Sequence, residues 1–393
     1  VSVQTHRIVN IVKHLHRIVK YISESIGNLG SDTYDSQTSL QDISYSEPFP
    51  CPTGQGSPGA RSPVRPTSVH RLRPGDIDVV GALGDSLSTA NGADSTNMME
   101  VIIENRGMAW SIGGQLSWRE YLTLPNILKE FNPNLVGYSF GDSLGFQLNS
   151  QFNVAEPGSI SDDMPFQATV LEKRMRLDSR VDLQNDWKLV AQLLVGNNDF
   201  CSFMCVYENY TEVLDHQSEF VREMQLKRIL SFAGKMTAQH LRVLQNLKRI
   251  PADCLTTLHI ECPCLFGFRW THLKENFTIL MDQFQQIDME IANSDRYSTK
   301  NDFAVVLQPF LTKSKVPEIK SKSGSTFVDL SFLAKDCFHF SQKGHALAAN
   351  GLWNNMMEPV GKKSRQLGTQ PFYKFLCPTE DHPFIYTSSS CHI

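Results

Sequence analysis

The stretch VVGALGDSLS, residues 79–88, decides the fold class because it joins an apolar run directly to a polar turn. The run from Val79 to Leu83 contains no polar side chain, whereas a strand with one face in water alternates apolar and polar residues. Continuous hydrophobicity over this length predicts a strand that is covered on both faces, as in a parallel sheet between helices. Gly84-Asp85-Ser86 then places a hydroxyl group at the carboxyl end of the strand, where open parallel sheets form their ligand crevice.

Short apolar runs alternate with longer helical patterns from Asp76 onward, which indicates an α/β domain. The expected buried strands are residues 79–83, 135–138, 189–195 and 303–307. The expected helices lie near residues 120–131, 165–177, 213–249, 270–292 and 341–357. We therefore predict a parallel sheet with helices on both faces.

The chain of 393 residues is long enough for one such domain and for extensions on either side of it. The expected domain spans residues 76–365, with a polar tail at 366–393. Residues 51–75 contain five prolines and four glycines and are expected to form a linker. Residues 1–50 form an N-terminal extension in which 6–22 have a basic amphipathic pattern. This pattern predicts a helix on an anionic membrane surface or, as we favour, a helix that packs on the domain or is poorly ordered.

Composition and charge exclude several classes of protein. Lysine plus arginine number 37 and aspartate plus glutamate 41, so the net charge of −4 lacks the basic excess that binding to nucleic acid requires. No apolar run is long enough to span a bilayer. The residues from Val1 onward do not show the pattern of a signal peptide and the tail is polar, so we expect neither a signal peptide nor a membrane anchor in the chain as given. We expect neither a nucleic-acid partner nor a transmembrane helix.

The chain has nine cysteines, at positions 51, 201, 205, 254, 262, 264, 337, 377 and 391. Several are clustered, but no histidine or second CxxC pair completes a zinc spacing. Disulfides are therefore favoured over a metal site, with one cysteine left over. The triplets that begin at Asn209 and Asn276 match glycosylation acceptors. Both observations favour an oxidising, extracellular setting.

Two serines are candidate nucleophiles. Ser86 follows the buried run, whereas Ser143 lies in Gly141-Asp142-Ser143-Leu144, which repeats the same four letters. A Gly-Asp-Ser triplet alone is most often a turn. A serine hydroxyl becomes nucleophilic only when a base takes its proton and a third group orients that base. The hypothesis of a catalytic serine thus requires a histidine and a carboxylate elsewhere in the chain.

Asp336 and His339 are the best-placed pair for this task, since they are three residues apart just before the expected helix 341–357. One turn of backbone at this spacing can bring the carboxylate to the imidazole. His345 falls within the expected helix, where it packs or faces solvent. Asp329 is a weaker orienting group because a longer segment separates it from the histidine.

A third block, Gly196-Asn197-Asn198-Asp199, follows the expected strand 189–195. A side-chain amide at the carboxyl end of a strand can donate a hydrogen bond to an oxygen that gains negative charge in a reaction. Alone, this block is an ordinary turn. Together with Gly-Asp-Ser after a strand and a late Asp-x-x-His, it forms a set in chain order.

These three blocks resemble the signature of the GDSL, or SGNH, hydrolases. Other stretches are similar to the catalytic repeat of the animal phospholipase B family of the membrane-associated type, and the resemblance covers about residues 48–385. These stretches are residues 66–74, 84–87, 106–114, 123–128 and 307–310. The resemblance implies a three-layer α/β/α, flavodoxin-like fold and a serine esterase.

The resemblance also implies a role for each candidate residue. Ser86 would be the nucleophile, His339 the general base and then acid, and Asp336 the group that orients His339. The backbone N–H groups of Ser86 and Gly158 and the side chain of Asn198 would form the oxyanion hole. No metal or cofactor is implied.

The implied activity is calcium-independent hydrolysis of acyl esters at both glycerol positions of phospholipids and in lysophospholipids, and it extends to retinyl esters and acylglycerols. The lipid would be presented by a membrane or micelle, and the enzyme would be secreted or held at the extracellular, apical face of the plasma membrane. Two alternatives remain: a GDSL esterase that acts on short acyl esters, and a catalytically impaired, lipid-binding repeat.

Three further features bear on this resemblance: one implied role and two departures from the family pattern. Ser143 falls in a variable loop of the family, which implies a structural role. Ser159 follows Gly158 where a small apolar residue is expected. Residues 241–251 continue a basic helical pattern and only 255–260 resemble a strand, so the fourth strand of the sheet is expected to be curtailed. That expectation motivates the impaired-repeat alternative.

Overall fold

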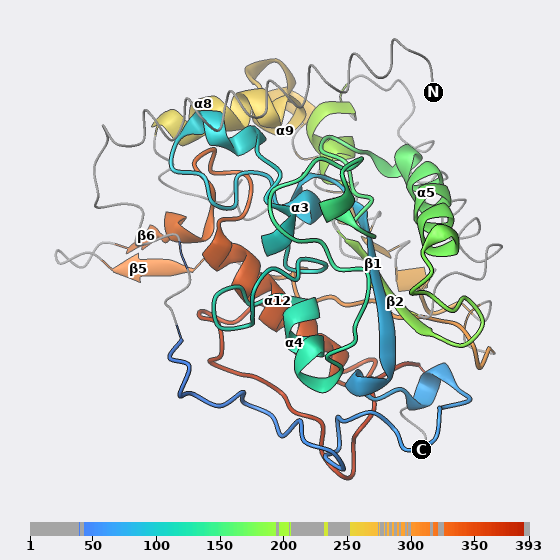
Figure 1. The fold of residues 1–393 in the computed structure, drawn as a ribbon. Helices are drawn as coiled ribbons and strands as arrows, with labels where there is room; N and C mark the ends of the chain where they lie inside the picture. Colours follow the sequence, from blue (N-terminus) through green and yellow to red (C-terminus); the bar gives the residue numbers. More distant parts are fainter. Residues whose placement is uncertain are drawn as a thin grey trace.

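The structure, a computed structural model of the chain, describes most of the segment between residues 43 and 388 (Figure 1). The described residues are 39, 43–193, 196–203, 205, 232–234, 252–273, 275, 279, 281–282, 285–286, 289–290, 292–294, 297, 300–314, 317–320 and 326–388. The pattern at 6–22 and the predicted glycosylation sites Asn209 and Asn276 lie outside them.

The centre of the fold is a parallel sheet with the strand order β1-β2-β3-β4. Its strands are β1 (Ile77–Gly84), β2 (Trp187–Leu193), β3 (Phe232–Gly234) and β4 (Ala304–Val305). β1 pairs with β2 along its whole length, and the last pair joins Gly84 to Leu193. The two longest strands therefore end at the same level, which brings the turns that follow them together.

Helices cover both faces of this sheet (Figure 1). The long helices of the two outer layers are α4 (Leu124–Phe131), α5 (Met164–Leu177) and α12 (Gln342–Met356). Val80 and Ala82 of β1 belong to the core cluster that contains α4 and α12, while Val79 and Leu83 belong to the cluster that contains α5. Because successive side chains of a strand point to opposite faces, an apolar run was needed to fill both layers. The predicted α/β/α arrangement is confirmed.

Other elements line the carboxyl end of the sheet and the surface. The remaining helices and a separate antiparallel hairpin are α3 (Ser86–Thr89), α8 (Ala252–Glu261), α9 (Pro263–Phe266), β5 (Glu318–Lys320) and β6 (Thr326–Val328). The 3-10 helices are Val69–Arg71, Pro74–Asp76, Met98–Ile102, Arg106–Met108, Leu148–Ser150, Ser161–Asp163, Phe268–Leu273 and Leu330–Phe332, and Asp199–Phe203 is a π-helical turn.

Two predicted strands are shorter than expected. The run 135–138 contributes a single parallel bridge, between Val79 and Val136. Gly137 ends the extended conformation with φ +104°, and a Cβ there would lie 2.2 Å from the Val80 carbonyl oxygen. The run 303–307 contributes only the two residues of β4.

The segment between β2 and β4 also differs from the prediction. β3 lies within the residue range 213–249, for which a helix was expected. The residues of β3 form a strand because their backbone pairs with both β2 and β4 and completes the sheet. The strand-like residues 255–260 belong instead to α8. Cys254 and Leu258, four residues apart, are buried on one side of this helix, and Cys262, directly after its end, is buried too. The sheet position for which the sequence offered residues 255–260 is therefore taken by β3, a strand of three residues.

Four disulfides join eight of the nine cysteines, and the ninth, Cys391, lies outside the described residues. The pairs are Cys51–Cys377, Cys201–Cys262, Cys205–Cys264 and Cys254–Cys337. The prediction of disulfides is thus confirmed, and the sequence alone could not assign their pairing.

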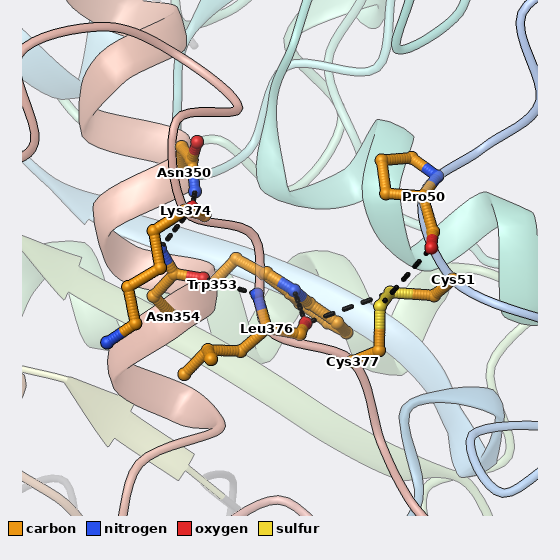
Figure 2. Close-up of a disulfide and its surroundings, with 8 residues drawn as sticks. All are labelled: Pro50, Cys51, Asn350, Trp353, Asn354, Lys374, Leu376 and Cys377. Atoms are coloured by element: carbon orange, nitrogen blue, oxygen red, sulfur yellow. Dashed lines mark hydrogen bonds between the residues drawn. A yellow bond between two sulfur atoms is a disulfide. The ribbon is translucent and has the colours of Figure 1, made fainter.

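The disulfide Cys51–Cys377 joins the two flanking segments to each other, and hydrogen bonds hold the C-terminal one against α12 (Figure 2). Trp353 Nε1 donates a hydrogen bond to the Leu376 carbonyl at 2.7 Å. Within the expected linker 51–75, Leu72 is fully buried in the core. The domain boundaries remain a prediction, but this segment packs against the domain.

Removal of this disulfide should lower the stability of the protein. The pair Cys51→Ala and Cys377→Ala releases a crosslink between residues 326 positions apart. We expect the free energy of unfolding, measured with denaturant under oxidising conditions, to fall by about 2–5 kcal/mol. Either single substitution breaks the same bond and should have nearly the same effect. An unchanged denaturation midpoint in all three variants would contradict the prediction.

Candidate active site

Ser86 is the first residue of α3 and lies directly after the carboxyl end of β1. Gly84 adopts φ +149°, which a residue with a side chain rarely tolerates. Asp85 caps the helix, as its Oδ1 accepts a hydrogen bond from the Leu87 N–H at 2.9 Å. This short turn places the Ser86 side chain at the edge of the sheet, largely shielded from solvent.

Asp336 and His339 form a buried pair in the loop before α12. Asp336 Oδ2 lies 2.5 Å from His339 Nδ1, and its Oδ1 accepts hydrogen bonds from the backbone N–H groups of Phe338 and His339 at 3.0 Å each. The carboxylate therefore holds both the ring and the backbone that carries it. His339 Nδ1 is the donor in this arrangement, which leaves the lone pair of the neutral ring on Nε2.

α8 supports this loop from outside. The disulfide Cys254–Cys337 joins α8 to the residue that follows Asp336, and Cys337 adopts φ +57°. Thr257 Oγ1 donates a hydrogen bond to the Asp336 carbonyl at 2.7 Å. The loop that carries the pair is thus fastened at two points to a helix from another part of the chain.

Hydrogen bonds join the front of the chain to its rear at this edge. The N–H of Gln342 donates to the Ala93 carbonyl at 2.8 Å, and the N–H of Lys335 donates to Ser95 Oγ at 3.3 Å. Asp85 also interacts electrostatically with His339. Among the described residues, however, no direct hydrogen bond joins Ser86 to His339, and His339 Nε2 is buried without a hydrogen-bond partner.

Asn198 and Gly158 meet at the same end of the sheet. Asn198 lies after β2, and its Nδ2 donates to the Ser159 carbonyl at 2.8 Å. Gly158 has φ +77°, and open space surrounds the position that a Cβ would occupy. The predicted residues after β1 and β2 and in the loop at 158 therefore share one edge of the sheet, as the rule for parallel strands implies.

The electrostatics of the pair favour an ionised carboxylate beside a basic imidazole. Burial lowers the pKa of His339, but the charge and hydrogen bond of Asp336, with the charges of Glu261 and Asp85, outweigh burial and raise this pKa. Burial raises the pKa of Asp336, whereas His339 and the two backbone N–H groups lower it, with a net decrease. The two shifts agree in direction with an Asp–His ion pair.

The pKa values of two neighbouring groups shift in the direction opposite to those of the pair. Burial is the largest cause that raises the pKa of Asp85 to about 7. Burial, with the nearby His339, lowers the pKa of His345 to about 3. The Trp110 N–H donates to His345 Nδ1 at 3.4 Å, so His345 is a neutral core residue and not a second base.

The other candidates are placed away from this pair. Ser143 is buried in a loop where its N–H donates to the Glu104 carbonyl and its own carbonyl accepts from Arg106 Nε. Asp329 caps the 3-10 helix Leu330–Phe332 through Ser331 N–H and pairs with Lys343 at 3.5 Å. In the described part of the chain, no hydrogen bond or ion pair joins either residue to Asp336 or His339.

Sequence reasoning missed the residues that support the site. Glu261 acts on the charge of His339, while Thr257 and the Cys254–Cys337 disulfide hold the loop. The cysteines were a visible signal, but their pairing was open. Nothing in the sequence singled out Gln167, which bonds to the end of β1.

Two kinds of feature are absent from the described residues. No group of three or more His, Cys, Asp or Glu side chains in this part of the chain is arranged to hold a metal ion. Likewise, no helix in the described ranges has the length and apolar content needed to cross a membrane.

The fold agrees with a comparison to known families. The sequence model of the GDSL-like Lipase/Acylhydrolase family matches residues 80–352. The chain belongs to this family, which is a class of carboxylic ester hydrolases.

Among curated proteins, the chain is similar to "Phospholipase B1, membrane-associated" of three mammals. The Homo sapiens protein is 38% identical over 336 residues, which cover 82% of this chain and 22% of that protein. The Rattus norvegicus protein is 38% identical over 336 residues, with 84% and 22% covered. The Mus musculus protein is 35% identical over 340 residues, with the same coverage of 84% and 22%. The chain thus spans only 22% of the length of these relatives.

The charge of the pair can be tested by titration. We expect His339 to titrate above its ordinary pKa, so that the imidazole is protonated below that raised pKa and neutral above it. In Asp336→Asn the attraction is lost, burial dominates, and the pKa of His339 should fall below its value in the parent chain. Nitrogen-15 NMR of labelled histidine side chains measures both values.

His345 provides the internal control for this titration. Its ring should stay neutral from about pH 5 to about pH 8, because its lowered pKa lies below that range. A pKa for His339 that does not change in Asp336→Asn would show that the carboxylate does not set the charge of the ring.

Proposed function

We propose that the chain is a serine esterase that hydrolyses acyl esters of lipids through an acyl-serine intermediate. Ser86 is the nucleophile, His339 the general base and then acid, and Asp336 the group that orients the imidazole. The observation that carries this proposal is the buried Asp336–His339 pair, whose Nε2 is unpartnered among the described residues, at the edge of the sheet that also holds Ser86. Membership in the acylhydrolase family supports it.

The first half of the reaction forms the acyl-enzyme. His339 Nε2 accepts the proton of the Ser86 hydroxyl as Ser86 Oγ attacks the ester carbonyl carbon. Asp336 stabilises the imidazolium that results, consistent with the raised pKa of His339. The imidazolium then donates its Nε2 proton to the departing alcohol, the C–O bond of the ester breaks, and the acyl group remains on Ser86.

The second half of the reaction releases the fatty acid. A water molecule gives a proton to His339 Nε2 and attacks the acyl-serine carbonyl carbon. Collapse of this second tetrahedral intermediate returns the proton to Ser86 Oγ. Both intermediates carry a negative oxygen, for which the N–H groups of Ser86 and Gly158 and the Asn198 amide are the proposed donors. Gly158 suits this role because its left-handed backbone exposes the peptide without a side chain to obstruct it.

The proposed substrates are phospholipids and lysophospholipids, cleaved without calcium at either acyl position, with retinyl esters and acylglycerols as further substrates. The similarity to membrane-associated phospholipase B1 supports the choice of phospholipids. Breadth is physically reasonable because an acyl pocket gains about 0.8 kcal/mol for each buried methylene, whichever head group is attached. Action at an extracellular membrane surface is part of the proposal, and the four disulfides are consistent with an oxidising compartment.

An exposed apolar segment near Ser86 supports a substrate presented at a lipid surface. Met98, Met99 and Ile102, in the 3-10 helix beyond α3, are 47%, 45% and 59% exposed. The N–H of Gly92 donates to the Ile103 carbonyl, which ties this segment to the residues directly after α3. Side chains of this kind can enter the interface of a membrane or micelle.

The choice of nucleophile is tested by two matched substitutions. Ser86→Ala should reduce fatty-acid release from phosphatidylcholine and lysophosphatidylcholine at least about a thousandfold, because no nucleophile remains. Ser143→Ala, also a buried serine, should retain activity. Both assays include a calcium chelator, and fatty acid is measured directly. Full activity of Ser86→Ala would exclude the proposed mechanism. Loss of activity in Ser143→Ala alone would show that Ser143, and not Ser86, is the nucleophile.

The apolar segment is tested by replacing Met98, Met99 and Ile102 together with serine. We expect about tenfold lower activity on phosphatidylcholine vesicles, because less apolar surface enters the lipid. Hydrolysis of a soluble short-chain nitrophenyl ester should be unchanged. Leu177→Ser, at the far end of α5, is the control for loss of an exposed apolar residue. Equal loss on both substrates would contradict a role at the lipid surface.

A further inference from the structure

Ser159, which departs from the family pattern, is the point where three separate segments are tied together. Its N–H donates to the Glu156 carbonyl at 3.2 Å. Its carbonyl accepts from Asn198 Nδ2 at 2.8 Å, and its Oγ accepts from Gln167 Nε2 at 2.9 Å. Ser159 is buried, so these bonds are shielded from competition with water.

Gln167 links the same loop to the strand that carries the nucleophile. From α5, its Oε1 accepts from the Gly84 N–H and its Nε2 donates to the Gly84 carbonyl, each at 2.9 Å. Gly84 lies two residues before Ser86. Since Nε2 has two hydrogens, one amide group can bond to Gly84 and to Ser159 at the same time. The end of β1 is thereby fixed relative to the loop that contains Gly158.

The Asn198 amide is oriented by the same residue. One of its two hydrogens is directed to the Ser159 carbonyl, which leaves the other for a ligand. The next residue strengthens this contact, because Asp199 accepts hydrogen bonds from Ser161 N–H and Ser161 Oγ. The side chains of Asn198 and Asp199, which follow β2, thus hold the loop 158–161 next to Asn198.

We infer that Ser159 and Gln167 are positioning residues for the oxyanion hole, an inference that rests on the proposed function. They act by keeping the Gly158 N–H and the free Asn198 N–H at a constant distance from Ser86. Donors that stabilise a developing charge are effective only when they are held in place before the charge appears. A loss of this connection should therefore weaken binding of the tetrahedral intermediate while binding of the planar ester is retained.

Two substitutions and their combination test this inference. Ser159→Ala removes only the hydroxyl, and Gln167→Leu removes the amide while retaining the shape of the side chain. We expect kcat/KM on a soluble nitrophenyl ester to fall about three- to tenfold in Ser159→Ala and about ten- to a hundredfold in Gln167→Leu, mainly in kcat. If Gln167 acts through Ser159, the double variant should fall little further than Gln167→Leu alone.

A transition-state analogue gives a readout that general loss of stability would not move. A trifluoromethyl ketone with a fatty chain forms a tetrahedral adduct with Ser86, and its inhibition constant should rise by the same factor as kcat/KM falls. The acid limb of the pH profile should stay in place, because the Asp336–His339 pair is not altered. Ser314→Ala is the control, as Ser314 is also a buried serine with two hydrogen bonds, to Phe310 and Leu367.

The outcomes separate this inference from the proposed function. If Ser159→Ala and Gln167→Leu lose activity and ketone affinity together and non-additively, while Ser314→Ala retains both, the inference stands. Suppose that the parent chain is active and Ser86→Ala is not, but that the ketone binds Ser159→Ala and Gln167→Leu as tightly as the parent. In that case only the positioning role is excluded. A folded parent chain that hydrolyses no ester overturns both. Circular dichroism and thermal unfolding identify a variant that does not fold. If Gln167→Leu does not fold, Ser159→Ala, which removes only one oxygen atom, tests the positioning role by itself.

Discussion

The parallel pairing of β1 with β2 between two layers of helices is the constraint on which the rest of the structure depends. Buried backbone N–H and C=O groups need partners, so two apolar strands in this position pair along their whole length. The register ends both strands together, with Gly84 opposite Leu193. The turns after them consequently share one edge of the sheet, and the roles proposed for Ser86 and Asn198 depend on that geometry.

The rear of the chain reaches this edge through contacts that are distant in sequence. α12 packs on the sheet beside α4, and hydrogen bonds from Lys335 and Gln342 to the segment after α3 hold the preceding loop. The disulfide Cys254–Cys337 and Thr257 add a second support from α8. A buried carboxylate and imidazole are costly unless they are paired. Their burial here depends on the hydrogen bonds that these supports keep in place.

Local patterns predicted the elements whose own sequence pattern extends over a whole strand or helix, and failed where a distant partner decided the conformation. β1 and α12 were placed correctly because the apolar and polar pattern of each matches its burial along the whole element. β3 has three residues, and only pairing with β2 and β4 makes them a strand. The residues of α8 have mixed propensity, and burial of Cys254 and Leu258 against the core selects the helix.

The class of fold, the disulfide-rich character and the candidate residues could all be derived from the amino-acid sequence, since apolar runs, cysteine number and short motifs are properties of the chain alone. Tertiary structure decided which cysteines pair, how the charge of His339 is set and how Ser159 joins Gln167 to Asn198. Burial and hydrogen bonding depend on side chains brought together from distant positions. No local spacing encodes those distances, because they arise only when the strands align and the helices pack.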